Sequence, residues 1–407
     1  MNVQTDPPPA QTRPLAEFVA LMALMISIVA LSTDAMLPAL AIIGRDLGVL
    51  EPNDNQLVVS AFFLGLAVGQ VFFGPISDSI GRKPAINAGF AIFAAGCVLS
   101  IVATDFNMML AGRVLQGIGA AGPRTVAVAL VRDQYAGRAM ARIMSFVMTV
   151  FILVPIAAPM LGQGILFFAE WHVIFALFLA LAVLAVVWLS LRQPETLPRE
   201  KRRPFSLMRI ARAMLEVVRT RAAVGAALAA GIIFSAMIGY LTSSQQIFQD
   251  TYQVGDLFAL YFAILAVAIG AASLTNARLV MRLGMRRLTV RALIAIIALS
   301  GVFFAIAAGL GGTPPLWAFM VYGMPTFFCM GILFGNLNAM AMEPLGHIAG
   351  VGSAVVASLT GFVSLVIGSS IGQAYDGTVL PLVGGYGVLA AAALVLVLWV
   401  GKGREDA

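Results

Sequence analysis

One carboxylic acid, Asp34, lies inside a long apolar stretch near the start of the chain, in the run LSTDAMLPAL. It is the only charged residue between Phe18 and Ile43. A carboxylate at bilayer depth is costly when it is ionised and unpaired, so such residues usually face a polar cavity or a partner. Desolvation favours the protonated form of the acid. Asp34 is therefore predicted to carry protons. A structural acid that hydrogen-bonds to nearby backbone is the alternative.

A second apolar stretch, AGRVLQGIGAAGPRTVAVALVRD, contains two arginines, Arg113 and Arg124. Arginine keeps its charge, so each guanidinium must find an acceptor or water. Gln116 lies on the same helical face as Arg113, and Gly117 begins a run of small residues that lets another helix approach closely. At about 1.5 Å per residue, Asp34 and Arg113 lie about 14 Å and about 9 Å below the outer ends of their helices. These depths allow an ion pair or a shared hydrogen-bond network. The role of Arg124, as a substrate contact or as the cap of an inner cavity, stays open.

Other apolar stretches carry helix-bending or polar residues. The run VPIAAPMLGQG holds Pro155, Pro159 and Gly162. Proline bends a helix and glycine permits tight packing, so kinked packing alone explains this pattern equally well. Polar side chains at lipid depth are predicted either to line a central substrate cavity or to bond neighbouring helices. They are Tyr240, Gln245, Gln246, Asn336 and Asn338.

The composition is that of a chain whose solvent is lipid. Of the 407 residues, 60% are hydrophobic and 11% are charged, whereas soluble domains carry roughly a quarter charged residues. The net charge of +6 does not point to nucleic acid, because the basic residues lie between apolar spans. The cysteines and histidines are isolated in sequence, which matches no metal site, disulfide framework or nucleophile pair. No cofactor is expected, and protons are predicted to be the coupling ion.

Twelve membrane-spanning helices are predicted by cutting the chain at charges and turn-forming residues, because a spanning helix needs roughly 20 apolar residues. The predicted spans are 16–43, 56–76, 84–103, 107–131, 141–167, 171–191, 222–248, 256–281, 288–310, 315–341, 350–374 and 382–401. Residues 1–15 and 402–407 are predicted to be tails. The first apolar run is too long for a signal-peptide core, so it is expected to remain as the first helix.

The charges of the loops predict the orientation. Loops after even-numbered spans are basic and include Arg82, Lys83 and Arg142. Loops after odd-numbered spans are mostly acidic, with Arg45 as the basic exception. Because basic loops stay in the cytoplasm, both termini are expected on the cytoplasmic side.

A basic segment, residues 192–221, divides the chain near its middle. Within it, apolar residues recur at helical spacing with arginines on the opposite face, which predicts a helix lying on the cytoplasmic membrane surface. The apolar positions are Leu207, Ile210, Ala211, Met214, Leu215 and Val218. The segment is predicted to link two six-helix bundles, residues 16–191 and 222–401. A regulatory protein-binding segment is the alternative.

A weak internal repeat supports two halves. The run GPISDSIGRK and the run RLVMRLGMRR, about half the chain apart, each place a glycine before basic residues. Parallel repeats are typical of transporters that hold the substrate between two bundles. In the first run, the Asp78 carboxylate is predicted to dock at the amino end of the eleventh span, residues 350–353, where a helix favours negative charge.

Together these patterns resemble the major facilitator superfamily over essentially the whole chain. GPISDSIGRK is similar to its loop motif after the second helix, which implies conformational gating by Gly74, Asp78, Gly81, Arg82 and Lys83. RVLQGIGAAGP is similar to its fourth-helix motif, with Arg113, Gln116 and Gly117. PIAAPMLGQG is similar to the fifth-helix motif of antiporters, with Pro155, Pro159 and Gly162.

Three further stretches, DAMLPALAIIGRDLG, GNLNAMAMEPLGHIAGVGSAV and YDGTVLPL, resemble the bicyclomycin-resistance, or Bcr/CflA, drug-efflux subfamily. This resemblance implies export of amphiphilic, drug-like molecules in exchange for protons across the bacterial inner membrane. The chain departs from the patterns at three positions. Ser79 replaces an arginine, Gln163 replaces a glycine, and Ile26 stands where some related pumps carry a second acid.

The sequence therefore predicts an all-α integral membrane protein of twelve transmembrane helices in two pseudo-symmetric six-helix bundles, working as a proton-coupled drug antiporter. A monomer is expected, with a small-molecule substrate and membrane lipid as partners and no nucleic acid. The chain lacks a G-x-x-x-x-G-K-[ST] loop and any cluster of catalytic residues, which argues against a nucleotide-driven pump and an enzyme. Transport of an ordinary metabolite and a non-transporting membrane sensor are the alternatives, because one fold serves many functions.

Overall fold

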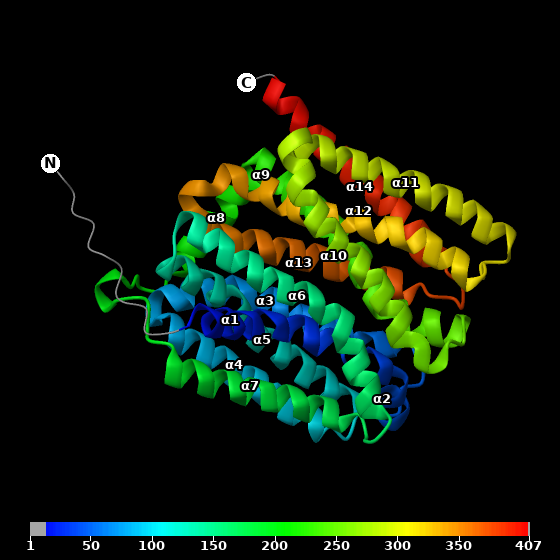
Figure 1. The fold of residues 1–407 in the computed structure, drawn as a ribbon, viewed down its shortest axis with the longest axis horizontal. Helices are drawn as coiled ribbons and strands as arrows, with labels where there is room; N and C mark the ends of the chain where they lie inside the picture. Colours follow the sequence, from blue (N-terminus) through cyan, green and yellow to red (C-terminus); the bar gives the residue numbers. More distant parts are fainter. Residues whose placement is uncertain (1–13, 406–407) are drawn as a thin grey trace.

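The computed structural model describes residues 14–405, and almost all of them are helical (Figure 1). The shorter helices are α2 (Leu40–Asp46) and α8 (Leu207–Arg219). The long helices are α1 (Leu15–Asp34), α3 (Leu57–Ile80), α4 (Arg82–Ile101), α5 (Phe106–Gln134), α6 (Gly137–Leu166), α7 (His172–Arg192), α9 (Arg221–Gln245), α10 (Phe258–Leu283), α11 (Met285–Gly309), α12 (Leu316–Met342), α13 (Ala349–Gln373) and α14 (Leu380–Glu405). The predicted tail at residues 1–15 lies outside the described residues except at its end, and α14 continues into the predicted tail at residues 402–407.

Each predicted span coincides with a helical segment. Within residues 14–405, eleven segments are long and apolar enough to cross a membrane, and one of them, Leu316–Gln373, contains both α12 and α13. The first segment, Leu15–Asp46, joins α1 to α2 through a short 3₁₀ turn at Leu37–Ala39. All twelve predicted spans are therefore present as helices, which confirms an all-α, multi-pass membrane protein.

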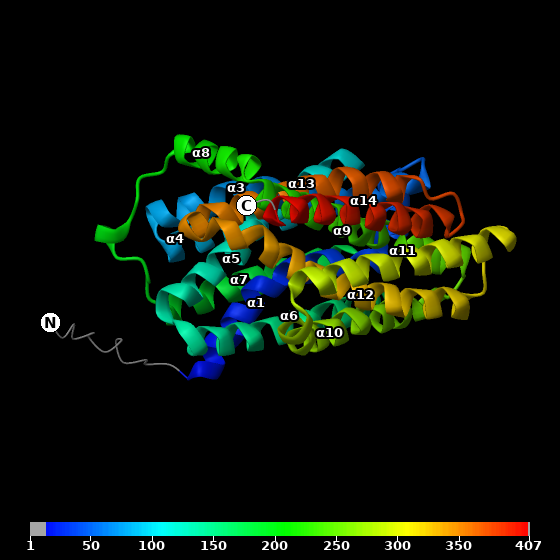
Figure 2. The ribbon, with the colours of Figure 1, turned by 90° about the horizontal axis from the view of Figure 1, so that it is seen from above.

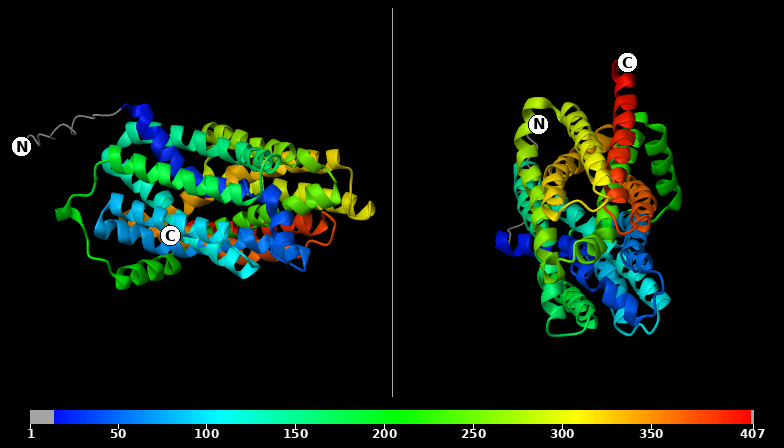
Figure 3. Two further views of the ribbon diagram at one scale, coloured as in Figure 1. Left: turned by 90° about the horizontal axis from the view of Figure 1, so that it is seen from below. Right: turned by 90° about the vertical axis from the view of Figure 1, so that its right-hand side faces the viewer.

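The long helices form two groups that follow the chain order. Helices α1 to α7 pack mainly with one another, and α9 to α14 form the second group (Figures 1 and 3). The main contacts between the groups come from two helix pairs, because α3 packs along α13 and α6 packs along α10. The helices of the two groups run from Leu15 to Arg192 and from Arg221 to Glu405, beside the ranges 16–191 and 222–401 predicted for the two bundles.

Small residues let α5 lie with its backbone almost against its neighbours. A Cβ atom at Gly117 would lie 2.0 Å from the carbonyl oxygen of Phe62 on α3. A Cβ atom at Gly119 would lie 2.3 Å from the main-chain nitrogen of Phe93 on α4. Side chains larger than hydrogen cannot fit at either position, so these glycines set the close helix spacing that the sequence predicted.

The end of α1 is set by a proline four residues later. An α-helix bonds the N–H of residue i to the carbonyl of residue i−4, but Pro38 has no N–H and its ring crowds the carbonyl of Asp34. The regular helix accordingly ends at Asp34, and the chain continues through the 3₁₀ turn into α2. The acid therefore lies where the first span is broken.

The predicted surface helix is present as α8, which lies on the outside of the bundle beside α13 (Figure 2). Its buried residues are Ile210, Ala213 and Val217, and the last two pack in a cluster with residues of α9, α12 and α13. Of the apolar residues predicted to face the membrane surface, Ile210 is buried and the other five are exposed.

Candidate functional site

The Asp34 side chain is buried, with 4% of its surface exposed. In the described part of the chain, its carboxyl group makes no ion pair and no hydrogen bond with protein. The nearest hydroxyl in sequence, on Thr33, donates to the Val29 carbonyl instead. The backbone hydrogen bonds that would make Asp34 a purely structural acid are therefore not formed.

The helix break next to Asp34 is packed by α6. A Cβ atom at Gly162 would lie 1.7 Å from the carbonyl oxygen of Ala35, the residue that follows the acid. Gly164, two residues further along α6, has nothing within 4 Å of its Cβ position. Of the antiporter-motif residues, Gly162 is thus the one that brings α6 against the broken end of α1. Pro155 and Pro159 lie inside the same continuous helix, α6.

Arg113 is fully buried on α5 and its guanidinium is satisfied by neutral groups. It donates to the carbonyl of Val58 at 3.0 Å, to the side chain of Gln116 at 2.6 Å and to the carbonyl of Ser32 at 3.1 Å. Its guanidinium carbon also lies 4.6 Å from the centre of the Phe62 ring, a cation–π contact. The ion pair with Asp34 that the helix depths allowed is not formed, because Arg113 contacts the backbone of α1 two residues before the acid.

Gln116 extends this network to α4. Its amide donates to the Gly96 carbonyl at 3.1 Å and to the Ser100 hydroxyl at 2.9 Å. Arg113 and Gln116 together therefore connect α5 to α1, α3 and α4. The fourth-helix motif is a buried scaffold whose hydrogen bonds hold the last turn of α1, and with it Asp34, in place.

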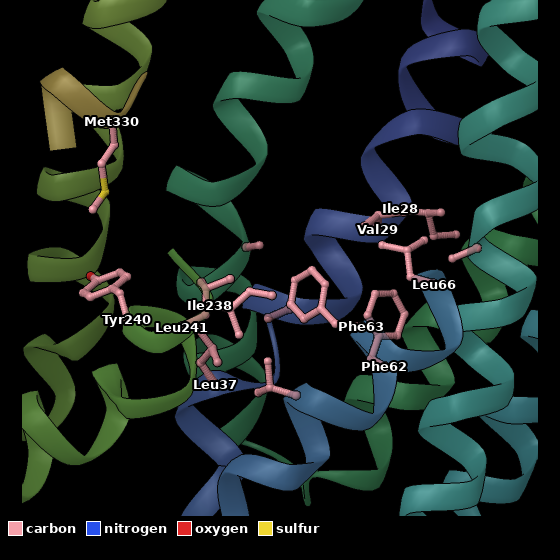
Figure 4. Packing of buried hydrophobic residues seen from close by; sticks show 14 of the residues in the cluster. Ile28, Val29, Leu37, Phe62, Phe63, Leu66, Ile238, Tyr240, Leu241 and Met330 are labelled. Atoms are coloured by element: carbon pink, nitrogen blue, oxygen red, sulfur yellow. The ribbon is translucent and has the colours of Figure 1, made fainter. Parts of the chain in front are cut away.

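In the second group of helices, Tyr240 of α9 is 1% exposed and its hydroxyl has no hydrogen-bond partner. Its ring stacks on Phe262 and meets Phe327 edge-on. Figure 4 shows Tyr240 beside Met330, next to the apolar side chains that join the two groups. The phenol lies within electrostatic range of the Asp34 carboxyl group. Tyr240 was predicted as a cavity residue, and it is the predicted polar side chain that lies near the acid.

Tyr386 of α14 is a residue that the sequence reasoning missed. Its hydroxyl is buried and also lacks a hydrogen-bond partner, and it lies within electrostatic range of Tyr240. Buried hydroxyls are normally hydrogen-bonded, so unpaired ones indicate a site for water or a ligand. The available signal was a lone polar residue at lipid depth in the run GGYGVL, the same signal that identified Tyr240.

The other predicted cavity residues take different places. Asn336 exchanges two amide hydrogen bonds with Asn276 of α10, at 3.0 and 3.1 Å, so it bonds a neighbouring helix. Gln245 donates to Gln249 within its own segment. Asn338 is exposed, and Arg124 is half-buried, with no ion pair or hydrogen bond in the described chain. None of these four residues is brought to Asp34 by a contact.

Amide side chains join the two groups at the end of the molecule where α3 begins and α13 ends. Gln56 donates to the side chain of Gln246 at 2.5 Å and to the Gly372 carbonyl at 2.9 Å. Asn53 donates to the carbonyls of Gln373 and Tyr375 at 3.0 and 2.9 Å. These bonds all cross between the groups and close this end. The sequence predicted Gln246 only as a cavity or packing residue, because its partners are about 190 or more residues away.

At the opposite end, the loop between α3 and α4 forms a charge network. Gly81 takes a φ of 111°, a conformation that favours glycine, and starts α4. Arg82 donates to Asp78 at 2.5 Å and to Asp133 at 2.8 Å, while Lys83 donates to the Ser190 carbonyl at 2.7 Å. The motif residues are thus brought together by ion pairs within the first group.

The amino end of α13 lies close to this loop. A Cβ atom at Gly74 would lie 3.6 Å from the Cβ atom of Ala354, and one turn further on Asp78 and Gly350 line the same cavity. In the described residues no hydrogen bond joins Asp78 to the backbone of α13. The acid therefore lies near its predicted docking place and is paired with Arg82.

Comparison with known proteins agrees with this architecture. Residues 22–369 match the family model of the Major Facilitator Superfamily. A bicyclomycin resistance protein homolog from Haemophilus influenzae is 30% identical over 372 residues, covering 90% of this chain and 91% of that protein. The multidrug resistance protein MdtM of Escherichia coli K12 is 29% identical over 315 residues, covering 75% of this chain and 74% of that protein.

Solved structures show the same fold at low sequence identity. The human organic anion transporter MFSD10 superposes with a TM-score of 0.70 at 18% identity, covering 95% of this chain and 100% of that one. A peptide transporter of the POT type superposes with a TM-score of 0.74 at 14% identity, covering 96% of this chain and 94% of that one. The superfamily that the loop and helix motifs predicted is confirmed, and the relative named for bicyclomycin resistance agrees with the predicted subfamily. The chain belongs to the Major Facilitator Superfamily.

Proposed function

We propose that this protein exports drug-like small molecules across the bacterial inner membrane in exchange for protons. The observation that carries the proposal is the buried carboxyl group of Asp34, unpaired at the broken end of α1. Relatives named for resistance to bicyclomycin, to multiple drugs and to chloramphenicol support a drug as the substrate. Both termini are proposed to face the cytoplasm, because the basic loops lie on that side.

The proton step rests on the contrast between the acid and the arginine near it. Arg113 stays charged, and its three acceptors are two backbone carbonyls and an amide oxygen, none of which titrates. Asp34 can change its charge, and no protein group holds it in one state. Binding a proton removes the cost of a buried carboxylate, and losing it restores a negative charge that favours water or a cationic drug.

In the proposed mechanism, the binding site opens alternately to the two sides of the membrane, and this alternation allows drug to be exchanged for protons. Asp34 belongs to the first group of helices, whereas Tyr240 and Tyr386 belong to the second. When the two groups rock, the surroundings of the acid change and so does its affinity for a proton. The amide bonds of Gln56 and Asn53 close the outer end in this structure, so they must break before substrate leaves to the outside.

The test is drug-induced proton release from purified protein in weak buffer. Wild type is expected to release protons when a bound drug displaces them. Asp34→Asn is expected to bind the drug and release none. Asp54→Asn, at an outer-loop acid whose side chain has no described partner, is the matched control and is expected to behave as wild type. Equal proton release from Asp34→Asn and wild type would place the carrier elsewhere.

Transport itself is measured in proteoliposomes with an imposed proton gradient. Uphill drug movement that collapses with a protonophore supports the antiporter, and Asp34→Asn is expected to allow only downhill movement. Gradient-independent uptake of a drug by wild type would contradict proton coupling, and the absence of any drug flux would contradict drug export.

A further inference from the structure

A cavity of about 420 Å³ lies at the end of the molecule where α3 ends and α13 begins. Four parts of the chain that are distant in sequence form its wall, and one of them is the end of α3 and the start of α4, with Asp78 and Arg82. Arg132 comes from the end of α5, and Ala349, Gly350 and Val351 come from the start of α13. The linker supplies four further basic residues, Lys201, Arg203, Arg209 and Arg212.

The positive charge of this cavity is not neutralised by protein. In the part of the chain that the structure describes, the side chains of Arg132 and of the four linker residues make no ion pair and no hydrogen bond. The two acids of the wall are already engaged, because Asp78 pairs with Arg82 and Glu216 pairs with His347. Five cations therefore surround one cavity without a counter-charge.

The start of α13 adds to the positive electrostatic potential of the cavity. Helix α13 is 25 residues long and follows directly on a 3₁₀ helix, Glu343–Ile348, and its first residues line the cavity. The amino end of a helix carries a partial positive charge that favours anions. The cations and the helix end thus point to the same kind of ligand, an anion that accepts several hydrogen bonds.

The position of α8 indicates where that anion comes from. Its apolar residues Leu207, Met208, Leu215 and Val218 are between 49% and 63% exposed, on the side away from its buried face. A basic helix with an exposed apolar edge lies at the boundary between lipid headgroups and acyl chains. Basic pockets between helices on the cytoplasmic side bind anionic headgroups.

We propose that this cavity binds the phosphate of an anionic phospholipid headgroup, held by Arg209 and Arg212 of α8, by Arg132 of α5 and by the amino end of α13. A soluble phosphate ion has the same chemistry and is the other source of such a ligand. The bound phosphate joins the linker to both groups of helices, and it occupies the helix end that the Asp78 carboxylate approaches. It therefore biases the balance between the conformations of the transporter.

The experiment measures lipid binding to the full-length protein in neutral detergent. Short-chain phosphatidylglycerol is titrated against phosphatidylcholine of the same chain length, and inorganic phosphate is tested against chloride at equal ionic strength. Wild type is expected to bind phosphatidylglycerol at least tenfold more tightly. Arg209→Gln combined with Arg212→Gln is expected to weaken that binding by about twenty-five-fold, since each basic residue near such a headgroup contributes about fivefold.

The matched control is Arg219→Gln, which removes the same charge from the same helix at an exposed position outside the cavity. It is expected to change the affinity by less than about twofold, because exposed charges beyond a Debye length are screened. If Arg219→Gln weakened phosphatidylglycerol binding as much as the double variant, the attraction would be diffuse and the proposed site would be overturned. Equal binding of the two lipids by wild type would also overturn the site. Tight binding of inorganic phosphate that phosphatidylglycerol does not compete with would assign the site to a soluble anion and overturn the lipid source.

A second variant distinguishes loss of the binding site from misfolding of α8. Arg132→Gln lies on α5, outside the linker, and is expected to weaken phosphatidylglycerol binding about fivefold while the protein keeps its elution volume and thermal stability. An unchanged affinity in Arg132→Gln would remove α5 from the site and contradict the proposed bridge between the linker and the first group.

Discussion

The guanidinium of Arg113 donates a hydrogen bond to the backbone carbonyl of Ser32, two residues before Asp34, at 3.1 Å. This bond links the buried scaffold of α5 to the last turn of α1, whose helix ends at the acid because of Pro38. The arginine is therefore a positioning residue for Asp34. Its hydrogen bonds go to neutral acceptors, so in the described residues it forms no ion pair with the Asp34 carboxyl group.

Replacing Arg113 tests this positioning role. Arg113→Ala removes three hydrogen bonds and leaves the Val58 and Ser32 carbonyls and the Gln116 amide oxygen with an unmatched acceptor. Hydrogen bonds to a charged group contribute about 1.5–3 kcal/mol each, so the variant is expected to lose several degrees of thermal stability and its transport. Arg219→Ala on the exposed face of α8 is the control and is expected to unfold as wild type does. A stable, fully active Arg113→Ala protein would contradict the role.

Two glycines of α6, Gly162 and Gly164, provide a matched pair of substitutions that tests the contact between α6 and the broken end of α1. In Gly162→Ala the new methyl group meets the Ala35 carbonyl oxygen, so α6 must move away from the end of α1. Overpacking of this kind costs about 1–3 kcal/mol, and loss of transport is expected. Gly164→Ala has open space at its Cβ position, and alanine is the better helix former by about 1 kcal/mol.

Thermal unfolding in detergent and drug efflux from cells measure both variants. Gly164→Ala is expected to match or exceed the wild-type stability and to keep efflux. If Gly164→Ala were the more damaging of the two substitutions, the close contact between α6 and α1 could not explain the antiporter motif.

Gln56 is expected to hold the two groups together at the end of the molecule where α3 begins. Gln56→Ala removes its bonds to Gln246 and to the Gly372 carbonyl, which join the two groups, so the closed arrangement becomes less stable relative to the open one. Spin labels at positions 54 and 376, in a background without Cys97 and Cys329, are expected to show a larger population of long distances. Gln134→Ala, which loses only a 3.5 Å bond to Leu130 on its own helix, serves as control. A distance distribution identical to wild type in Gln56→Ala would show that these amides do not hold the outer end.

Asp78 is expected to govern the opposite end. Asp78→Asn weakens its pairing with Arg82 and removes the negative charge that faces the amino end of α13, where a carboxylate contributes roughly 0.3–1 kcal/mol. A shift in the balance of conformations is expected, with drug binding retained. Spin labels on the ends of α3 and α13 measure it, and Asp133→Asn, which also touches Arg82 but does not line the cavity, separates the two effects. Equal shifts in both variants would attribute the effect to Arg82 alone.

Much of the fold could be predicted from the sequence because its cause is local. Whether a segment crosses the membrane depends on about 20 consecutive residues and their transfer from water to lipid. All twelve spans and the amphipathic α8 are accordingly present. The isolation of Asp34 and the proline that follows it are also local, so the candidate acid and the break beside it were both readable in LSTDAMLPAL.

Tertiary structure alone decided the partners of these residues. The depth of Arg113 along its helix allowed an ion pair with Asp34, but the rotation of α5 against α1 and α3 directs the guanidinium to backbone carbonyls. Asn336 could have lined a cavity, and its pairing with Asn276 follows from the packing of α10 on α12. The burial of Ala213 and Val217 of α8 was likewise set by the neighbouring helices α9, α12 and α13. Such contacts join segments tens to hundreds of residues apart, and helical spacing fixes a residue's face without fixing which helix that face meets.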